Sequence, residues 1–391
     1  MLCCAPVWQA IHKAFEIFFA VCACASIAYY CLCIWSGLKF IRTPRPRVTE
    51  FRPPVSILKP LKGIEPGIYE AFRSHCLQDY HEYEIIFGVS EADDPALKVI
   101  QELRREFPHL RIQSVFCDRK LGTNLKVSNL AQMLQLAMHE HIVVNDADIT
   151  VPLDYLTRIM RPLGDAMVGL VTCLYRGEAG QSLGSRLETL GISTDFAPGV
   201  MVAERLEGGL SFGLGSTLAL RRKDLQACGG FEKFLDFLAD DYELGRSIAA
   251  GGLKVILSNC VVQTNVGEYR WKQFFEHQLR WSRTIRDARK WGYLGFGMTF
   301  GIWWALLALI ASAGAVWSWI LFGAVLATRG TVAGLVGWQA LHDRTVLRLP
   351  YLIPVKDVVG FWIWLAGWLG NRVKWRGQEY VLKGGRLTSA D

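Results

Sequence analysis

The chain has 391 residues, the length of about two average domains, and 51% of them are hydrophobic, including 14 tryptophans. This apolar and tryptophan content is high for an ordinary soluble protein and implies contact with a membrane. We attribute the net charge of +7 to contact with anionic headgroups and a polyphosphate ligand. A nucleic-acid partner is not expected, because no basic helix with interleaved aromatic residues is present in the sequence.

An apolar segment near the N-terminus, residues 14–38, contains one acidic residue and is long enough to cross about 30 Å of hydrocarbon. A cleaved signal peptide is the alternative. The apolar stretch exceeds the usual signal core, however, and no small-residue cleavage site follows it. We therefore predict an uncleaved transmembrane helix. The positive-inside rule places the segment after it in the cytoplasm, because basic residues follow: Lys39, Arg42, Arg45, Arg47 and Arg52.

From residue 55 to about residue 262, short apolar runs alternate with amphipathic stretches. Runs rich in β-branched residues predict buried strands at 55–59, 84–89, 111–116 and 141–145, with 168–173 as a fifth candidate. Apolar residues at three- and four-residue spacing predict helices at 66–77, 95–107 and 124–138. This alternation indicates an α/β domain with a mainly parallel sheet, whose ligands bind beyond the carboxyl ends of the strands.

Three loops that follow predicted strands carry charged residues. Lys59 lies at the end of the first strand, and Glu91 and Asp93 follow the second. These acidic side chains are candidates for contact with a nucleotide, whereas Asp94, which precedes a proline, also suits a helix cap. For Lys126, phosphate contact and simple solvation both remain open.

Asp146 and Asp148 stand one residue apart at the end of the fourth predicted strand. Residues i and i+2 of an extended chain point to the same side, so both carboxylates can reach one hard cation. Mg²⁺ and Mn²⁺ favour carboxylate oxygens and are often held by one or two of them together with substrate phosphates. The same triplet also occurs in many solvated turns, so the rest of the chain must support a metal site.

A second acidic pair, Asp240 and Asp241, leads into a predicted helix over 244–250. Helix capping is one explanation for an acid at this position. A general base is the other, because a carboxylate within hydrogen-bond reach of an acceptor hydroxyl can take its proton as the new bond forms. Gly229 and Gly230 in the preceding loop allow the close backbone approach that such a site needs.

Near residue 280 the spacing places His277, Arg280 and Trp281 on one face of a predicted helix. Arg280 can pair with a phosphate through two donors, and Trp281 can stack or pack beneath it. A basic amphipathic helix at the bilayer surface explains the same pattern. The two interpretations are compatible.

The C-terminal third contains two further apolar stretches. Residues 294–326 are uncharged and too long for one ordinary span, so we predict a helical hairpin that turns near 312–314, with a single long tilted helix as the alternative. Residues 358–369 form either a span or an interfacial helix. A cytoplasmic C-terminus, and so an even number of spans after the catalytic domain, is expected from the basic tail: Arg372, Lys374, Arg376, Lys383 and Arg386.

Taken in order, five motifs resemble those of the ceramide glucosyltransferases and their bacterial relatives, a membrane branch of the inverting GT-A glycosyltransferases of families 2 and 21. The motifs are Leu58-Lys-Pro-Leu-Lys-Gly, Asp93-Asp-Pro-Ala, Asn145-Asp-Ala-Asp, Ala239-Asp-Asp-Tyr and Arg280-Trp. The resemblance covers most of the chain. It implies a Rossmann-like GT-A catalytic domain in the cytosol, flanked by transmembrane helices at both ends of the chain.

The resemblance also implies ligands and roles. A UDP-sugar is the expected donor, and a lipid of the ceramide or hopanoid type is the expected acceptor. Asp146 and Asp148 are expected to hold Mg²⁺ or Mn²⁺, and Asp241 is the expected base. The expected donor-binding residues are Lys59, Glu91, Asp93, Lys126 and Asp146. The residues expected near the acceptor and the diphosphate are Asp240, His277, Arg280 and Trp281.

The chain departs from the family pattern at two positions. Glu91 stands where the family usually shows its first acidic residue, so Glu91 or Asp93 takes that role. The family signature (Gln/Arg)-x-x-Arg-Trp ends at Arg280 and Trp281, but it begins here with His277, and Gln278 is one position out of step. A histidine can still contact a phosphate.

The expected activity is inverting transfer of a hexose, glucose in the first place, to the hydroxyl of a membrane lipid such as ceramide. Transfer of N-acetylglucosamine to a hopanoid or another lipid polyol is the alternative. A processive polysaccharide synthase would need more spans, and a non-enzymatic adaptor would not need the full set of sites. The expected segments of this multi-pass protein are an anchor (1–40), a GT-A domain (50–265), an interfacial segment (266–292), a membrane region (293–371) and a basic cytoplasmic tail (372–391).

Overall fold

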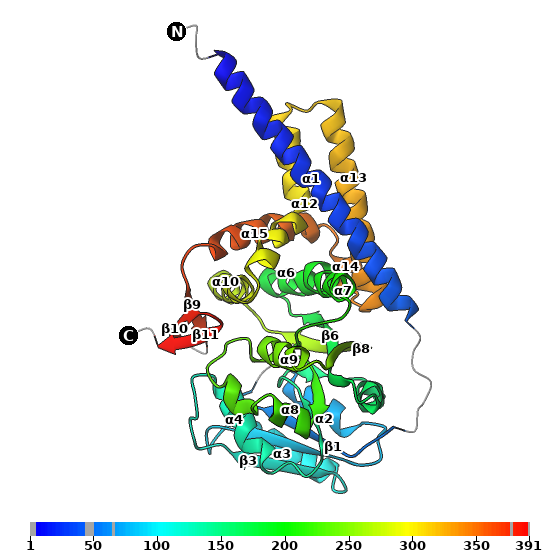
Figure 1. The fold of residues 1–391 in the computed structure, drawn as a ribbon, viewed down its shortest axis with the longest axis vertical. Helices are drawn as coiled ribbons and strands as arrows, with labels where there is room; N and C mark the ends of the chain where they lie inside the picture. The colour runs from blue at the N-terminus through cyan, green and yellow to red at the C-terminus, as the bar shows by residue number, and fades with distance from the viewer. Residues whose placement is uncertain (1–4, 44–50, 65–66, 376–377, 390–391) are drawn as a thin grey trace. The chain divides into compact units, whose positions relative to one another are not determined.

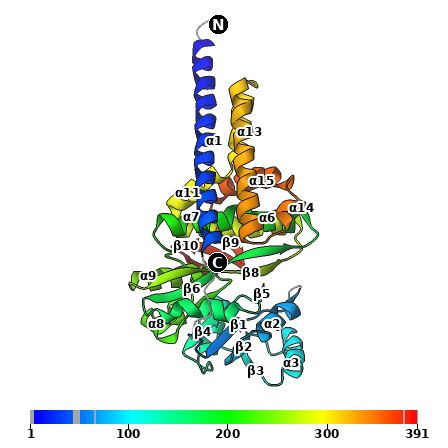
Figure 2. The same ribbon diagram turned by 90° about the vertical axis from the view of Figure 1, so that its right-hand side faces the viewer.

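The computed structural model describes residues 5–43, 51–64, 67–375 and 378–389. Arg45, Arg47, Arg376 and the expected helix start at residue 66 lie outside these ranges. The chain divides into two compact units (Figures 1 and 2). We call them the helical unit (1–42, 181–202 and 269–374) and the sheet unit (43–180, 203–268 and 375–391). Residues 181–202 thus group with the flanking helices, and residues 375–391 group with the sheet. The segments expected from the sequence are contiguous and do not include this exchange.

The sheet unit is built on an eight-stranded sheet with the strand order β3-β2-β1-β4-β7-β6-β8-β5. Strands β1 to β4 pair in parallel, as do β6 and β8, whereas β7 is antiparallel to both of its neighbours and β5 is antiparallel to β8. The predicted mainly parallel sheet is therefore confirmed, with antiparallel strands added. The bounds are β1 Val55–Pro60, β2 Tyr83–Val89, β3 Arg111–Phe116, β4 His141–Val144, β5 Ile149–Thr150, β6 Val168–Ala179, β7 Leu218–Arg221 and β8 Lys254–Val266.

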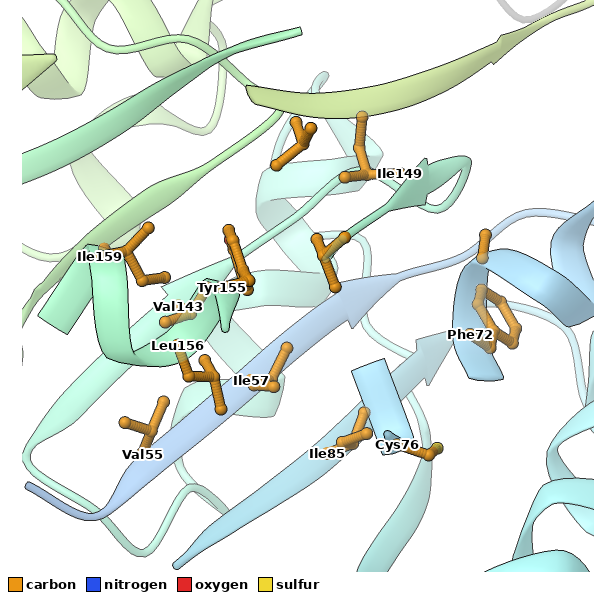
Figure 3. Packing of buried hydrophobic residues seen from close by; sticks show 14 of the residues in the cluster. Val55, Ile57, Phe72, Cys76, Ile85, Val143, Ile149, Tyr155, Leu156 and Ile159 are labelled. Atoms are coloured by element: carbon orange, nitrogen blue, oxygen red, sulfur yellow. The ribbon is translucent and has the colours of Figure 1, made fainter. Parts of the chain in front are cut away.

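The four predicted strands β1 to β4 are confirmed to within one residue at each end. Strands β1, β2 and β4 are buried almost throughout, as parallel strands covered by helices require, whereas β3 lies at the edge of the sheet and is partly exposed. Ile57 of β1 pairs with Ile85 on one side and Val143 on the other. These side chains pack with Phe72 and Leu156 in one buried cluster (Figure 3). The continuous apolar runs in the sequence are the local cause of this core.

Helices cover both faces of the sheet. Phe72 of α2, Ile100 of α3 and Leu156 of α5 belong to the cluster on one face, whereas α4 packs against β1 and β2 on the other, where Gly88 leaves room for Met133. The helices of the sheet unit are α2 Ile68–Cys76, α3 Ala96–Glu106, α4 Leu125–Leu134, α5 Tyr155–Met160, α8 Arg222–Ala227 and α9 Asp240–Ala250, with short 3-10 turns Arg161–Gly164 and Phe231–Phe234. A hairpin of β10 Gln378–Lys383 and β11 Arg386–Ser389 completes the unit.

Within the described ranges, the helical unit contains two helices that are long and apolar enough to cross a membrane, Val7–Arg42 and Val316–Ala340. The pair Lys290–Thr299 and Gly301–Ala311, bent by 59°, is a third candidate if it forms one broken span. The elements of the helical unit are α1 Ala5–Arg42, α6 Leu183–Gly191, α7 Ala197–Leu206 (which extends past the unit boundary), α10 Trp271–Ala288, α11 Lys290–Phe296, α12 Gly301–Ala311, α13 Val316–Val332, α14 Thr345–Arg348, α15 Leu352–Gly367 and β9 Arg372–Trp375 (which also extends past it). Two π-helical turns, Ile192–Phe196 and Ala333–Ala340, complete the unit.

The structure decides between the two predictions for residues 294–326. Helices α12 and α13 form a hairpin, and both pack along α1 (Figures 1 and 2). The chain turns at Ala313 and Gly314, which have φ angles of 50° and 77°. The predicted turn near 312–314 is therefore confirmed, and the single long helix is excluded. Glycine favours this turn because it reaches the left-handed region without a steric cost.

A buried ionic cluster ties α13 and α15 to the π-helical turn Ile192–Phe196. The guanidinium of Arg329, with 1% of its side chain exposed, donates to Asp195 Oδ1 and to Asp357 Oδ1, both at 2.7 Å. It also donates to the carbonyl of Thr194 at 2.5 Å, and Lys356 pairs with Asp195. Each charge in this cluster has a partner of opposite sign, as buried charges require.

Candidate active site

Asp146 lies two residues after the last residue of β4, at the carboxyl end of a parallel strand where ligands bind in α/β sheets. The predicted placement of the Asp146–Asp148 pair at a strand end is confirmed. The chain is not extended through the pair, because Ala147 and Asp148 form a turn and the amide of Ile149 donates to the carbonyl of Asp146 at 3.4 Å. Asn145 anchors this turn by donating to the carbonyl of Ser216 at 2.6 Å.

The two carboxylates of this turn interact electrostatically. Desolvation raises the pKa of Asp148, and the charge of Asp146 raises it further, whereas a hydrogen bond from Thr264 Oγ1 opposes both effects. A carboxylate whose pKa is raised by a neighbouring carboxylate is stabilised in its ionised form by a nearby cation. Mg²⁺ and Mn²⁺ accept such oxygen ligands, so the donor set fits a divalent ion. Among the described residues no group of three or more His, Cys, Asp or Glu side chains forms a metal site, so a divalent ion here would take its further ligands from water or a substrate.

Lys126 supplies a positive charge at this place. Its Nζ lies 2.7 Å from Asp146 Oδ1 and 3.5 Å from Asp240 Oδ2, with 13% of the side chain exposed. Burial lowers the pKa of Lys126, but the charges of Asp146, Asp240 and Asp241 outweigh it and raise the pKa overall. Simple solvation is therefore wrong for Lys126. Asn124 sets its position by capping α4 and accepting hydrogen bonds from the amides of Lys126 and Val127.

Asp241 lies in the first turn of α9, next to Asp240. Its Oδ2 accepts a 2.6 Å hydrogen bond from the amide of Gly215, and its Oδ1 accepts one from its neighbour Tyr242 at 2.8 Å. Desolvation and then the charge of Asp240 raise the pKa of Asp241 to about 6, although Lys126 opposes them. A carboxylate with this pKa is ionised at neutral pH and yet basic enough to accept a proton from a hydroxyl.

Gly215 joins the two acidic motifs. A Cβ atom at this position would lie 2.9 Å from Asp146 Oδ2, 3.1 Å from Asp241 Oδ2 and 3.5 Å from Lys126 Nζ. The glycine thus lets the backbone approach all three charged groups. Asp146 and Asp241, 95 positions apart in the sequence, therefore face the same glycine in the tertiary structure.

Lys59 is fully buried behind the Asp146–Asp148 turn. Its Nζ donates to the carbonyl of Asp146 at 3.0 Å and lies 3.5 Å from His75 Nε2. Burial lowers the pKa of Lys59 to about 7, while the charges of Asp148 and Asp146 oppose that shift. Its contact is with the backbone of the turn, so its expected role in donor binding stays a prediction.

Glu91 and Asp93 are both exposed on the loop after β2. Their neighbour Asp94 is buried and accepts hydrogen bonds from the amides of Gly63 and Ala96, each at 2.9 Å. The capping role of Asp94 is confirmed. The structure thus leaves Glu91 and Asp93 available to a ligand, and their contact with a nucleotide stays a prediction.

His277, Arg280 and Trp281 belong to the helical unit, on α10. The rings of His277 and Trp281 lie 5.0 Å apart between centroids, which confirms that they share one helix face. Glu188, which the sequence did not single out, holds this face: its Oε2 lies 3.1 Å from His277 Nδ1 and accepts a 3.0 Å hydrogen bond from Gln278. Gln278, one position out of step with the family signature, thus shares the carboxylate partner of His277.

Sequence reasoning missed Gly215, Asn124, Thr264 and Glu188. Asn124 carried a usable signal, because an asparagine directly before a helical pattern is a typical cap. The other three carry no local motif. Each meets the site residues only through contacts between segments that are far apart in the sequence.

Comparisons with known proteins identify the fold and the family of this chain. The structure superposes on the mannosyltransferase PcManGT from Pyrobaculum calidifontis, solved in complex with GDP-Man and Mn²⁺. The TM-score is 0.55 at 20% identity, and the superposition covers 92% of this chain and 99% of that one. The fold is therefore that of the GT-A glycosyltransferases. Glycosyl transferase family 21 matches residues 17–388, and the chain belongs to that family.

The chain is also similar in sequence to ceramide glucosyltransferases. Ceramide glucosyltransferase 3 of Caenorhabditis elegans is 26% identical over 230 residues, which are 59% of this chain and 50% of the worm protein. Ceramide glucosyltransferase of Komagataella phaffii is 31% identical over 117 residues, which are 29% of this chain and 23% of the yeast protein. The matched region thus spans half or less of the length of these two relatives.

Proposed function

We propose that the protein transfers a hexose, glucose in the first place, from a UDP-sugar to the hydroxyl of a membrane lipid such as ceramide. The observation that carries this proposal is the juxtaposition of Asp241, with its raised pKa, and Asp146 across Gly215 and Lys126. One motif suits a base, and the other suits the cation of a nucleotide diphosphate. Membership in family 21 and the similarity to ceramide glucosyltransferases favour a lipid acceptor.

The proposed reaction is a single displacement with inversion. Asp241 takes the proton of the lipid hydroxyl while the hydroxyl oxygen forms a bond to the anomeric carbon. The bond from that carbon to the phosphate oxygen breaks, and UDP leaves with the electron pair. A divalent ion held by Asp146 and Asp148 supplies charge stabilisation to the diphosphate when it is bound. Lys126 and Arg280 are proposed to add positive charge to the same leaving group.

The proposal includes the remaining ligands and the orientation. We place Asp240, His277 and Trp281 near the acceptor and the diphosphate, and Lys59, Glu91 and Asp93 on the donor side. We also propose an anchor and two later spans, with the sheet unit in the cytoplasm. The candidate helices support this number if the bent pair counts as one span, and the basic residues Lys39 and Arg42 at the end of α1 support the orientation. The boundaries expected from the sequence remain part of this proposal.

The deciding experiment combines purified protein with UDP-glucose or UDP-N-acetylglucosamine, each offered with ceramide or a hopanoid polyol, and identifies the product by mass. A glucosylated ceramide supports the proposal. An N-acetylglucosaminyl lipid would instead support the alternative donor, and a polysaccharide product would support a processive synthase. Asp241→Asn should abolish turnover while UDP binding persists. Activity that is unchanged by EDTA would overturn the assignment of Asp146 and Asp148 to a metal.

A further inference from the structure

The last described residues form a tight β-hairpin in the sheet unit. Strands β10 and β11 pair antiparallel, with Lys383 opposite Arg386 (the red strands near the C-terminus in Figure 1). Gly384 and Gly385 connect them with φ angles of 58° and 78°. Two consecutive residues at positive φ match the turn geometry that suits two-residue hairpins. Residues 378–389 of the basic tail thus form a β-hairpin.

The hairpin is bonded to the loop that precedes the second acidic motif. The amide of Leu238 donates to the carbonyl of Gly385 at 3.0 Å, and the amide of Leu387 donates to the carbonyl of Asp236 at 2.8 Å. Between these two bonds the guanidinium of Arg386 lies over the ring of Phe237, 5.0 Å from its centroid. Residues 236–238 therefore extend the hairpin by one short strand-like contact.

The same loop is bonded to the start of α4. Asp236 Oδ1 accepts hydrogen bonds from the amide and the hydroxyl of Thr123, at 3.0 and 2.9 Å. The amide of Asn124 donates to the carbonyl of Leu235 at 2.7 Å, and its side-chain amide donates to the carbonyl of Phe237 at 2.8 Å. The loop thus lies between the C-terminal hairpin and the first residues of α4.

The start of α4 and the loop 235–238 both continue into charged residues of the candidate active site. Asn124 Nδ2 also donates to Asp240 Oδ1 at 3.2 Å. Lys126 is two residues after Asn124, and Asp240 is two residues after Leu238. The distances between Lys126 and the acidic pair therefore depend on the position of the 235–238 loop, which the hairpin holds.

We propose that the C-terminal hairpin is a positioning element for Asp240, Asp241 and Lys126, acting through residues 236–238. Gly385 and Arg386 are its positioning residues and touch no reacting group. This inference rests on the proposed function of Asp241 as the base. It makes a segment at the far end of the chain a determinant of the rate of the chemical step.

The turn offers a matched pair of substitutions. A Cβ atom at Gly385 would lie 3.1 Å from Phe237 Cδ1, whereas a Cβ atom at Gly384 meets nothing within 4 Å. Both glycines have positive φ, so Gly385→Leu and Gly384→Leu introduce a similar backbone strain. Only Gly385→Leu pushes against the loop that leads to Asp240.

Gly385→Leu should lower kcat by about tenfold or more, because a misplacement of about 1 Å at a reacting group costs about a hundredfold. The donor KM should change little, and the acidic limb of the kcat–pH profile should shift. Hydrogen exchange of residues 235–241 should accelerate. Gly384→Leu should leave all four readouts within about twofold of the parent protein, at an equal loss of thermal stability.

Equal kcat values in the two variants would overturn the proposal, and so would a loss of kcat without faster exchange at 235–241. Adding Phe237→Ala to the Gly385→Leu variant should restore part of the lost kcat, because it removes the ring that the new side chain would contact. Failure of the proposed function is recognised separately. In that case the parent protein transfers no hexose, while the hydrogen-exchange difference between the two variants still tests the mechanical link.

Discussion

The ionisation of Asp241 should control the rate in the weakly acidic range. Burial and the charge of Asp240 raise the pKa of this carboxyl group from an ordinary value of 3.8 to about 6. The carboxylate is the active form of a base, so activity is lost as the pH falls through the raised pKa. At pH 5 about a tenth of the unliganded molecules would carry the carboxylate, and kcat/KM would fall about tenfold. An exposed aspartate would remain more than about 90% ionised at that pH.

The assay measures kcat/KM in detergent between about pH 4.5 and 8, because this ratio reports the pKa values of the unliganded enzyme. Each acidic sample is returned to pH 7.5 to show that the loss of activity is reversible, and circular dichroism at the acidic pH shows that the protein stays folded. A profile that is flat down to about pH 4.5 would refute the assignment of Asp241, since an aspartate with an unshifted pKa gives that result. The tenfold difference expected at pH 5 makes the two outcomes easy to separate.

Three further substitutions test other contacts. Lys126→Met should move the acidic limb of the pH–activity profile to higher pH, because the charge of Lys126 lowers the pKa of Asp241. Lys126→Arg, which keeps the charge, is the control. An unchanged acidic limb in Lys126→Met would contradict the reasoning. Gly215→Ala should weaken UDP-sugar binding, measured by calorimetry, and lower kcat by about a hundredfold, because its Cβ atom would contact Asp146 and Asp241. Binding and kcat equal to those of the parent protein would contradict this and show that the backbone can shift to make room. Asp357→Ala should destabilise the helical unit by about 3 to 5 kcal/mol, because Arg329 loses a buried partner; an unchanged melting temperature in detergent would argue against the cluster.

Local patterns predicted most single elements of the fold. Strands β1 to β4, the apolar helix α1 and the turn at Ala313–Gly314 all lie where the sequence placed them. Each depends on side chains that are close in the chain: β-branched runs, a long uncharged stretch or a glycine in a turn. The cap at Asp94 belongs to the same group, because a capping side chain bonds to amides of its own segment.

The sequence by itself determined the chemical types at the site: two acidic motifs, a lysine near them and a strand end that brings Asp146 to the edge of the sheet. Only the tertiary structure decided which groups meet. It placed Lys126 between Asp146 and Asp240, Gly215 against Asp146 and Asp241, and the C-terminal hairpin against residues 236–238. These contacts join residues that are many positions apart, so they depend on strand order and loop packing, which no local periodicity encodes.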